Sequence, residues 1–198
     1  MKVRKLLPFV LALGLALTLF LPTQAAELTY EVTGGKLYFD AATGTITRAD
    51  ETITQADIPA EIYGVPVTAI GDYVFNQHKQ LESITIPDTV TYIGRQAFGA
   101  CSSLEEVVLP DSVTLLDQGV FSGCTGLKSV TLSRSLTSIP RDTFAACSSL
   151  TSVTLPEGIT TIGRDAFAGS GITSLTLPNS VTTLSNSSLA DCKKLQSL

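Results

Sequence analysis

Few side chains of this 198-residue sequence are suited to catalysis. The sequence contains a single histidine, His78, together with four cysteines, one methionine and no tryptophan. No nucleophilic-serine motif, H-E-x-x-H motif or glycine-rich phosphate loop accompanies the histidine. Because a general base needs a partnered site that tunes its proton affinity, we expect His78 to be a solvated turn residue. We therefore expect no enzymatic activity and no cofactor.

Glu105 and Glu106 are adjacent carboxylates, a pairing that invites an acid–base interpretation. Consecutive residues of an extended strand point to opposite sides, so the two groups do not converge on one substrate atom. We interpret them as a charged surface patch.

The four cysteines, Cys101, Cys124, Cys147 and Cys192, occupy one position of a repeating pattern. They lack the C-x₂₋₄-C spacing or histidine partners of a zinc site, so no metal is expected. Equivalent positions of stacked repeats lie about 4.8 Å apart, which is near the Cα separation of a disulfide. The alternative is a ladder of buried free thiols, since free cysteine is among the most buried residue types. We favour the ladder, and disulfides stay open.

Repetition with a period of 23 residues organises most of the sequence. The segment 84–87 recurs at 107–110, 130–133, 153–156 and 175–178, at offsets of 23, 23, 23 and 22. Phenylalanines recur with the same period, at Phe98, Phe121, Phe144 and Phe167. A degenerate copy of the repeat precedes the regular copies. Such regularity predicts a solenoid in which each copy forms one coil.

Each coil combines a short strand with a return segment. The pattern L-x-x-V-x-L at 104–109 alternates in the manner of a half-buried strand, and Pro110 ends it because proline cannot donate to a β-ladder. Val113 and Leu116 supply inward side chains on the return. We expect residues 95–100 to form one helical or 3₁₀ turn. A single coil cannot bury its own apolar side chains, so the coils must stack.

These repeats resemble the BspA-type leucine-rich repeats of bacteria. The resemblance covers roughly residues 58–198 and is carried by 93–104 (Ile-Gly-Arg-Gln-Ala-Phe-Gly-Ala-Cys-Ser-Ser-Leu) and by its copy at 162–167. It implies a mainly β leucine-rich-repeat solenoid of short-strand coils. It also implies a secreted or cell-surface protein with a role in adhesion or protein binding. Coil four departs from the pattern at Ser170, where the others carry cysteine, and coil five has Leu189 in place of phenylalanine.

Residues 1–25 have the basic start, apolar stretch and small-residue exit of a signal peptide. Its removal changes the net charge from −5 to −8, with ten basic residues against 18 acidic ones. An acidic chain without a basic run is not expected to bind nucleic acid or an anionic membrane. We expect a secreted or cell-surface protein that does not insert into the membrane once the signal is removed.

Residues 26–57 predict an N-terminal antiparallel β cap, with strands near 28–33, 36–39 and 45–47. The array follows at 58–198, with a degenerate coil at 61–83 and regular coils at 84–106, 107–129, 130–152, 153–174 and 175–197. The last coil has no cap, so we expect the chain to be truncated at its C-terminus.

The outward side of the strands is the candidate binding surface. Serine and threonine dominate it, and a hydroxyl-lined sheet needs no ligand to be soluble. The candidate partner-binding residues are Glu82, Glu105, Glu106, Val108, Lys128, Thr131 and Thr154. One hypothesis is an adhesin-like module that binds a host or bacterial surface protein. The other is a structural stalk that displays a missing C-terminal domain and has no ligand of its own.

Two columns of charged residues predict ion-pair ladders between coils. The first column places an arginine between two acids and consists of Asp88, Asp111, Arg134, Glu157 and Asn179. The second column consists of the arginines Arg95, Arg141 and Arg164.

Overall fold

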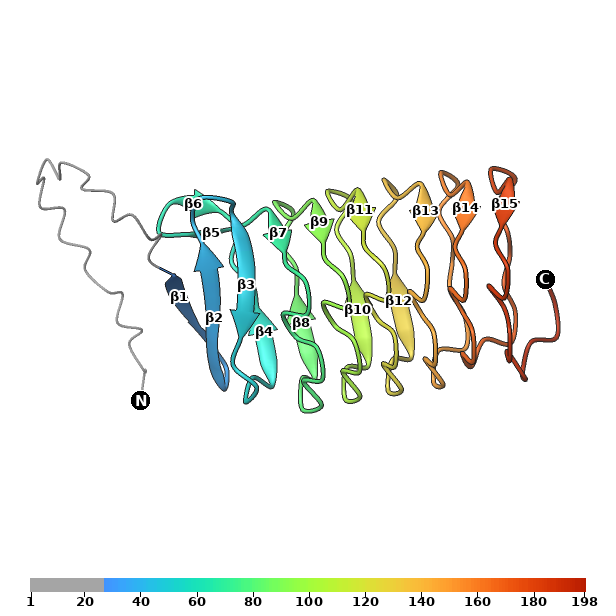
Figure 1. The fold of residues 1–198 in the computed structure, drawn as a ribbon, viewed down its shortest axis with the longest axis horizontal. Helices are drawn as coiled ribbons and strands as arrows, with labels where there is room; N and C mark the ends of the chain where they lie inside the picture. The colour runs from blue at the N-terminus through green and yellow to red at the C-terminus, as the bar shows by residue number, and fades with distance from the viewer. Residues whose placement is uncertain (1–26) are drawn as a thin grey trace, which may run out of the picture.

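The computed structural model describes residues 27–198, and this part of the chain contains β-strands and turns but no helix. The coils stack along the long axis of the molecule, and most of the short strands fall into two rows (Figure 1). This architecture confirms the mainly β solenoid. The predicted signal peptide at 1–25 lies outside the described residues.

The first row follows the return side of the coils. Strands β3 (Thr45–Ala49), β7 (Ala69–Ile70), β9 (Tyr92–Ile93) and β11 (Leu115–Leu116) pair in parallel, and β13 (Ser138–Ile139), β14 (Thr161–Ile162) and β15 (Thr183–Leu184) form a second parallel group. The register places one apolar side chain of each strand in line and, except in β15, buries it. The row therefore closes one side of the core.

The N-terminal segment forms the predicted antiparallel meander. Strand β1 (Leu28–Val32) pairs with β2 (Gly35–Asp40), which pairs with β3. A hairpin of β5 (Glu61–Ile62) and β6 (Val65–Pro66) lies beside it. Because β3 pairs with β7, and β4 (Gln55–Asp57) pairs with β8 (Ser83–Thr85), the end of this segment already shares the parallel ladders of the coils. The division at residue 57 stays a prediction.

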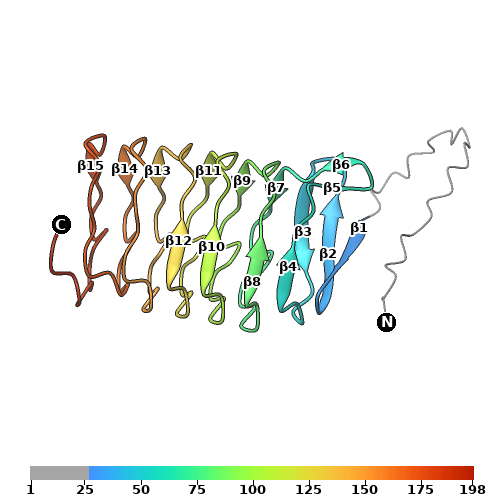
Figure 2. The same ribbon diagram turned by 180° about the vertical axis from the view of Figure 1, so that it is seen from behind.

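The second row carries the outward-facing strands, and we call its outer side the sheet face. It comprises the strands at 55–57, 83–85, 106–108 and 129–131 and continues through residues 152–154 and 174–176, which form no strand. Strand β4 pairs with β8, and β10 (Glu106–Val108) pairs with β12 (Ser129–Thr131), but β8 and β10 are not paired. Figure 2 shows these four strands side by side in the lower row. The sheet face is thus interrupted.

The third side of each coil, which we call the turn wall, consists of residues 95–101 and their equivalents at 72–78, 118–124, 141–147, 164–170 and 186–192. The segment 95–100 forms neither the expected helical turn nor a 3₁₀ helix: only the amides of Ala97 and Gly99 donate to carbonyls three residues earlier. Alternate amides donate to the next coil instead, from Gln96 to Gln118 O (3.0 Å) and from Phe98 to Val120 O (3.0 Å). A helix would direct its amides to carbonyls four residues earlier in the same segment.

Left-handed residues make this pattern possible. Gln96 has a φ of 46° and Ala100 a φ of 57°, and the equivalent residues of all six coils also have positive φ. They form two columns: Tyr73, Gln96, Gly119, Asp142, Asp165 and Ser187, and Gln77, Ala100, Gly123, Ala146, Gly169 and Asp191. Such residues reverse the local winding, so the chain crosses the wall extended enough to hydrogen-bond to its neighbour coil.

The core beneath the turn wall is a stack of phenylalanines. Successive ring centroids lie 5.3 to 5.7 Å apart with interplanar angles of 6° to 22°, from Phe75 through Phe98, Phe121 and Phe144 to Phe167. All five side chains are fully buried. Each is worth about 1.5–3 kcal/mol of burial free energy, which is available only when the coils stack.

The cysteines line the same core as free thiols. The Sγ atoms of Cys101, Cys124 and Cys147 are buried, and each donates to the carbonyl oxygen of a phenylalanine in the preceding coil at 3.0 to 3.1 Å. Cys192 is half-buried and donates to Phe167 O. The structure thus agrees with the ladder, and the thiol hydrogen bonds stabilise contacts between coils.

His78 is buried, with 5% of its surface exposed, so the expectation of a solvated turn residue is wrong. It occupies the cysteine position of the degenerate coil and places its ring edge-on to Phe75, with centroids 5.6 Å apart. Nε2 lies 3.1 Å from Asp50 O and Nδ1 3.3 Å from Asn76 O. His78 therefore packs against the first ring of the phenylalanine stack and contacts the segment after β3.

Candidate binding surface on the sheet face

The structure places all seven candidate residues on the surface, along β8, β10 and β12 and the segments that enter or extend the row. Strand alternation explains the exposure of Glu106, Val108 and Thr131, because Val107 and Val130 point into the core. Glu82, Glu105 and Lys128 are exposed in the segments just before the strands. The register aligns Glu106 with Ser129 and Val108 with Thr131. Val108 is 54% exposed in a column that otherwise carries threonine.

Only one pair among the candidates forms an ion pair. Lys128 Nζ lies 2.7 Å from Glu105 Oε1, and both side chains are more than 60% exposed. Such a pair contributes about 0–1 kcal/mol to folding. Glu82 and Glu106 have no basic partner within the described part of the chain. The sheet face therefore carries uncompensated negative charge.

A hollow lies between β8 and β10 that the sequence did not predict. It has a volume of about 400 Å³. We call it the first hollow; its lining is Ser83, Ile84, Thr85, Ile86, Glu106, Val108 and Pro110. Two candidates, Glu106 and Val108, belong to it, and the isoleucines give it an apolar floor. The 23-residue period of the sequence does not indicate this hollow.

A second hollow of about 300 Å³ lies farther along the same face. It is lined by Ser152, Val153, Thr154, Leu155, Glu157, Ser174, Thr176 and Pro178. Thr154 is the one candidate that it includes, and Thr131 lies outside both hollows. Each hollow thus combines apolar side chains, hydroxyl groups and a carboxylate.

Both hollows lie where neighbouring coils are not joined by a β-ladder. Among the described residues, no main-chain hydrogen bond connects 83–86 with 106–109, or 152–155 with 174–178. By contrast, β10 and β12 are paired, and Leu109 N donates to Thr131 O at 2.9 Å. The interruption leaves main-chain polar groups without a ladder partner beside the first hollow.

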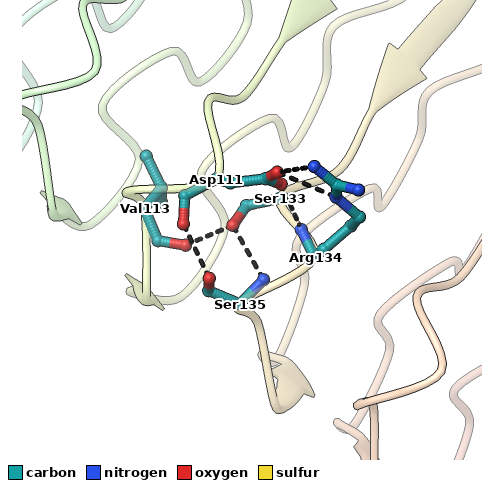
Figure 3. Close-up of polar contacts among 5 residues, drawn as sticks. All are labelled: Asp111, Val113, Ser133, Arg134 and Ser135. Atoms are coloured by element: carbon teal, nitrogen blue, oxygen red, sulfur yellow. Dashed lines mark hydrogen bonds and ion pairs between the residues drawn. The ribbon is translucent and has the colours of Figure 1, made fainter.

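The predicted ion-pair ladders are only partly present. Figure 3 shows Arg134 paired with Asp111: its backbone amide donates to Oδ1 at 2.9 Å and its Nε to Oδ2 at 2.8 Å. In the same cluster the Ser133 hydroxyl donates to Val113 O at 2.6 Å, and the Ser135 hydroxyl to Asp111 O at 2.7 Å. The Arg134 side chain, and after it the Arg134 backbone amide, donate these hydrogen bonds to the ionised Asp111 carboxylate and so lower its pKa. This cluster joins two neighbouring coils.

The other column is not a ladder between coils. Arg141 pairs with Asp142 at 2.8 Å and Arg164 with Asp165 at 2.9 Å, so each arginine contacts its sequence neighbour. No described ion pair joins Arg134 to Glu157 either. The prediction of continuous ladders is therefore wrong in both columns.

The described residues offer no cluster suited to metal binding, because no three His, Cys, Asp or Glu side chains converge there. The neighbouring Cys124 thiol, followed by burial, raises the pKa of Cys101, and burial raises the pKa of Cys147. These two cysteines are therefore protonated at neutral pH and poor nucleophiles. No helix among the described residues is long and apolar enough to cross a membrane.

The repeat pattern and the fold together place the chain in a known class. The family model of the BspA type leucine rich repeat region matches residues 68–196 with six copies. The chain belongs to this family of leucine-rich repeat proteins. A search of curated proteins gives no significant match.

Several solved structures share the fold. A leucine-rich repeat protein of T. pallidum is 28% identical, with a TM-score of 0.75 over 89% of this chain and 80% of its own. A leucine-rich cell surface protein of Faecalibacterium prausnitzii is 31% identical, with a TM-score of 0.63 over 85% of this chain. The match spans 53% of that protein. A leucine-rich repeat protein of Bacteroides ovatus, at 24% identity and a TM-score of 0.52, is similar in fold.

Proposed function

We propose that the chain is an exported, adhesin-like module that binds a host or bacterial surface protein through its sheet face. The observation that carries the proposal is the first hollow, where an exposed Val108 and unpaired Glu106 interrupt a face otherwise covered with serine and threonine. Exposed apolar side chains beside charged ones are typical of binding surfaces. The description of the F. prausnitzii relative as a cell surface protein supports this location.

The experiment is capture of surface and extracellular-matrix proteins by the chain without residues 1–25. It is repeated with the variant Glu105→Ala/Glu106→Ala/Lys128→Ala. The matched control is Arg141→Ala/Asp142→Ala/Arg164→Ala, which removes the exposed Arg141 and Arg164 and the half-buried Asp142 from the turn wall. We expect a saturable partner that only the sheet-face variant loses. Equal binding by all three proteins would contradict the proposal.

The second candidate function is a structural spacer without a ligand. The uninterrupted hydrogen bonding of the turn wall supports it, because such a ladder stiffens the stack of coils. A spacer predicts no saturable partner for the isolated chain. It also predicts that exposed sheet-face substitutions leave all binding of the intact protein unchanged.

A further inference from the structure

We propose that the sheet face takes an extended, cationic segment of its partner, which runs along the long axis and places apolar side chains of residues i and i+4 in the two hollows. This inference rests on the proposed function, since it specifies what that surface binds.

Each hollow has room for an apolar side chain and an apolar lining to receive it. Ile84, Ile86, Val108 and Pro110 supply the apolar atoms of the first hollow, and Val153, Leu155 and Pro178 those of the second. Ser83 and Thr85 in the first hollow occupy the same repeat positions as Ser152 and Thr154 in the second. The two hollows are therefore the same kind of site, built twice on one face.

The spacing of the hollows selects an extended segment. The equivalent residues Ser83 and Ser152 are three coils apart in the 23-residue repeat, which corresponds to roughly 14–15 Å at the spacing of neighbouring strands. Four residues of extended chain span about 13–14 Å. Residues i and i+4 of a strand also point to the same side, so both side chains can face the sheet. A spacing of five would turn one of them away.

Charge selects a cationic segment. Glu106 lines the first hollow, Glu157 lines the second, and Glu82 lies in the segment that leads into β8. None of the three takes part in an ion pair within the described residues. The one lysine of this region, Lys128, is already paired with Glu105. Lysine or arginine beside the two apolar anchors would compensate these carboxylates.

The interrupted ladder adds main-chain recognition at the first hollow. Directly after β10, the amide of Leu109 is directed toward β12. Backbone alternation therefore directs the amides of Glu106 and Val108 toward β8, where no ladder bond receives them. Polar groups of a bound segment can pair with these amides, which a continuous sheet would not offer.

The test uses fluorescein-labelled peptides and the chain without residues 1–25, with binding followed by fluorescence anisotropy. The probe is KKLSTSLKK, with leucines four residues apart. One comparison peptide, KKLSTSTLKK, moves them to a spacing of five, and another, EELSTSLEE, reverses the flanking charge. We expect the probe to bind at least about tenfold more tightly than either comparison, since each loses one anchor or the charge attraction. Equal affinities, or no binding of any peptide at millimolar concentration, would overturn the proposal.

Variants of the chain locate the binding. Val108→Thr installs the residue that neighbouring coils carry at this position, so the fold is retained. We expect Val108→Thr and Glu106→Gln each to lower the affinity for the probe peptide about fivefold. Thr131→Val, outside both hollows, should change this affinity less than about twofold. Unchanged binding in both hollow variants would overturn the proposal.

The two proposals fail in different ways. If the triple sheet-face variant loses a captured partner but the peptides show no preference, only the extended-segment proposal is wrong. If the peptides bind as expected but the captured partner is retained by the triple variant, the partner uses another surface and the proposed function is wrong.

Discussion

The turn wall and the sheet face are built from the same repeats but are bonded differently. On the turn wall, alternate amides donate to the next coil at every junction, and the phenylalanine stack beneath is continuous from Phe75 to Phe167. On the sheet face, pairing stops between β8 and β10. The wall repeats the same contacts in each coil, whereas the face varies in both side chains and pairing.

This difference separates stability from recognition. A continuous ladder over a buried aromatic stack joins every pair of neighbouring coils, so the face is not required to be continuous. Residues such as Val108 and Glu106 are then free to depart from the serine and threonine background. Four sets of substitutions test this division of roles, in order of decreasing expected effect.

The largest effect is expected from the core of the turn wall. Phe121→Ala removes a fully buried ring between two stacked neighbours, and we expect it to lower the free energy of unfolding by about 3–5 kcal/mol. Val108→Ala, on the exposed face, should lower it by less than about 0.5 kcal/mol. Urea unfolding followed by circular dichroism measures both. A similar loss in the two variants would contradict the division of roles.

The thiol ladder should have an intermediate effect. Cys124→Ala removes a buried side chain and its hydrogen bond to Phe98 O, so we expect a loss of about 1–2 kcal/mol. Cys124→Ser should lose less, because Ser170 already fills this position in coil four and is buried there. Urea unfolding followed by circular dichroism measures the loss of unfolding free energy in both variants. A larger loss for serine than for alanine would show that the hydrogen bond is unimportant.

At the turn-wall positions with positive φ, replacing alanine by glycine and glycine by alanine should change the stability of the protein in opposite directions. Gly123 and Ala146 hold equivalent positions, with φ of 75° and 59°. We expect Ala146→Gly to stabilise the protein and Gly123→Ala to destabilise it, each by about 1 kcal/mol, since only glycine adopts this conformation without strain. An added Cβ at Gly123 would meet Ala100 at 3.6 Å, so crowding is not the cause. Thermal unfolding of the two variants checks the signs.

The smallest effect is expected at the exposed Asp111–Arg134 pair, and it should depend on pH. Arg134 lowers the pKa of Asp111 in the folded state, so the pair stabilises the protein above the ordinary pKa of an aspartate. This contribution is lost as the pH falls through the lowered value. The stability difference between wild type and Arg134→Ala should therefore be present at pH 7 and shrink below about pH 4. A difference that grows on acidification would contradict the assignment.

Periodicity alone predicted the solenoid, its inward residues and the exposed positions of the sheet face. It did so because spacings of 23 residues encode which side chains stack, as in the column of Phe98, Phe121 and Phe144. The left-handed residues of the turn wall escaped prediction, since Gln96 and Ala100 are not residue types that favour positive φ.

Contacts outside the period were also missed. His78 is buried because it covers the end of the aromatic stack and contacts the segment after β3, and neither fact follows from its polar sequence neighbours. The first hollow depends on missing hydrogen bonds between β8 and β10, although their sequences follow the same repeat as β10 and β12.

Amide hydrogen exchange tests the contrast between the two surfaces most directly, because the chain contains its own controls. Glu106 and Val108 face the unpaired junction, while Ser129 and Thr131 hold the same positions one coil later and are paired with β10. We predict that the first two amides exchange at least about 100-fold faster than the second two, and that the Phe98 and Phe121 amides of the turn wall are among the slowest. Equal protection of Glu106 and Ser129, and of Val108 and Thr131, would contradict an interrupted sheet face.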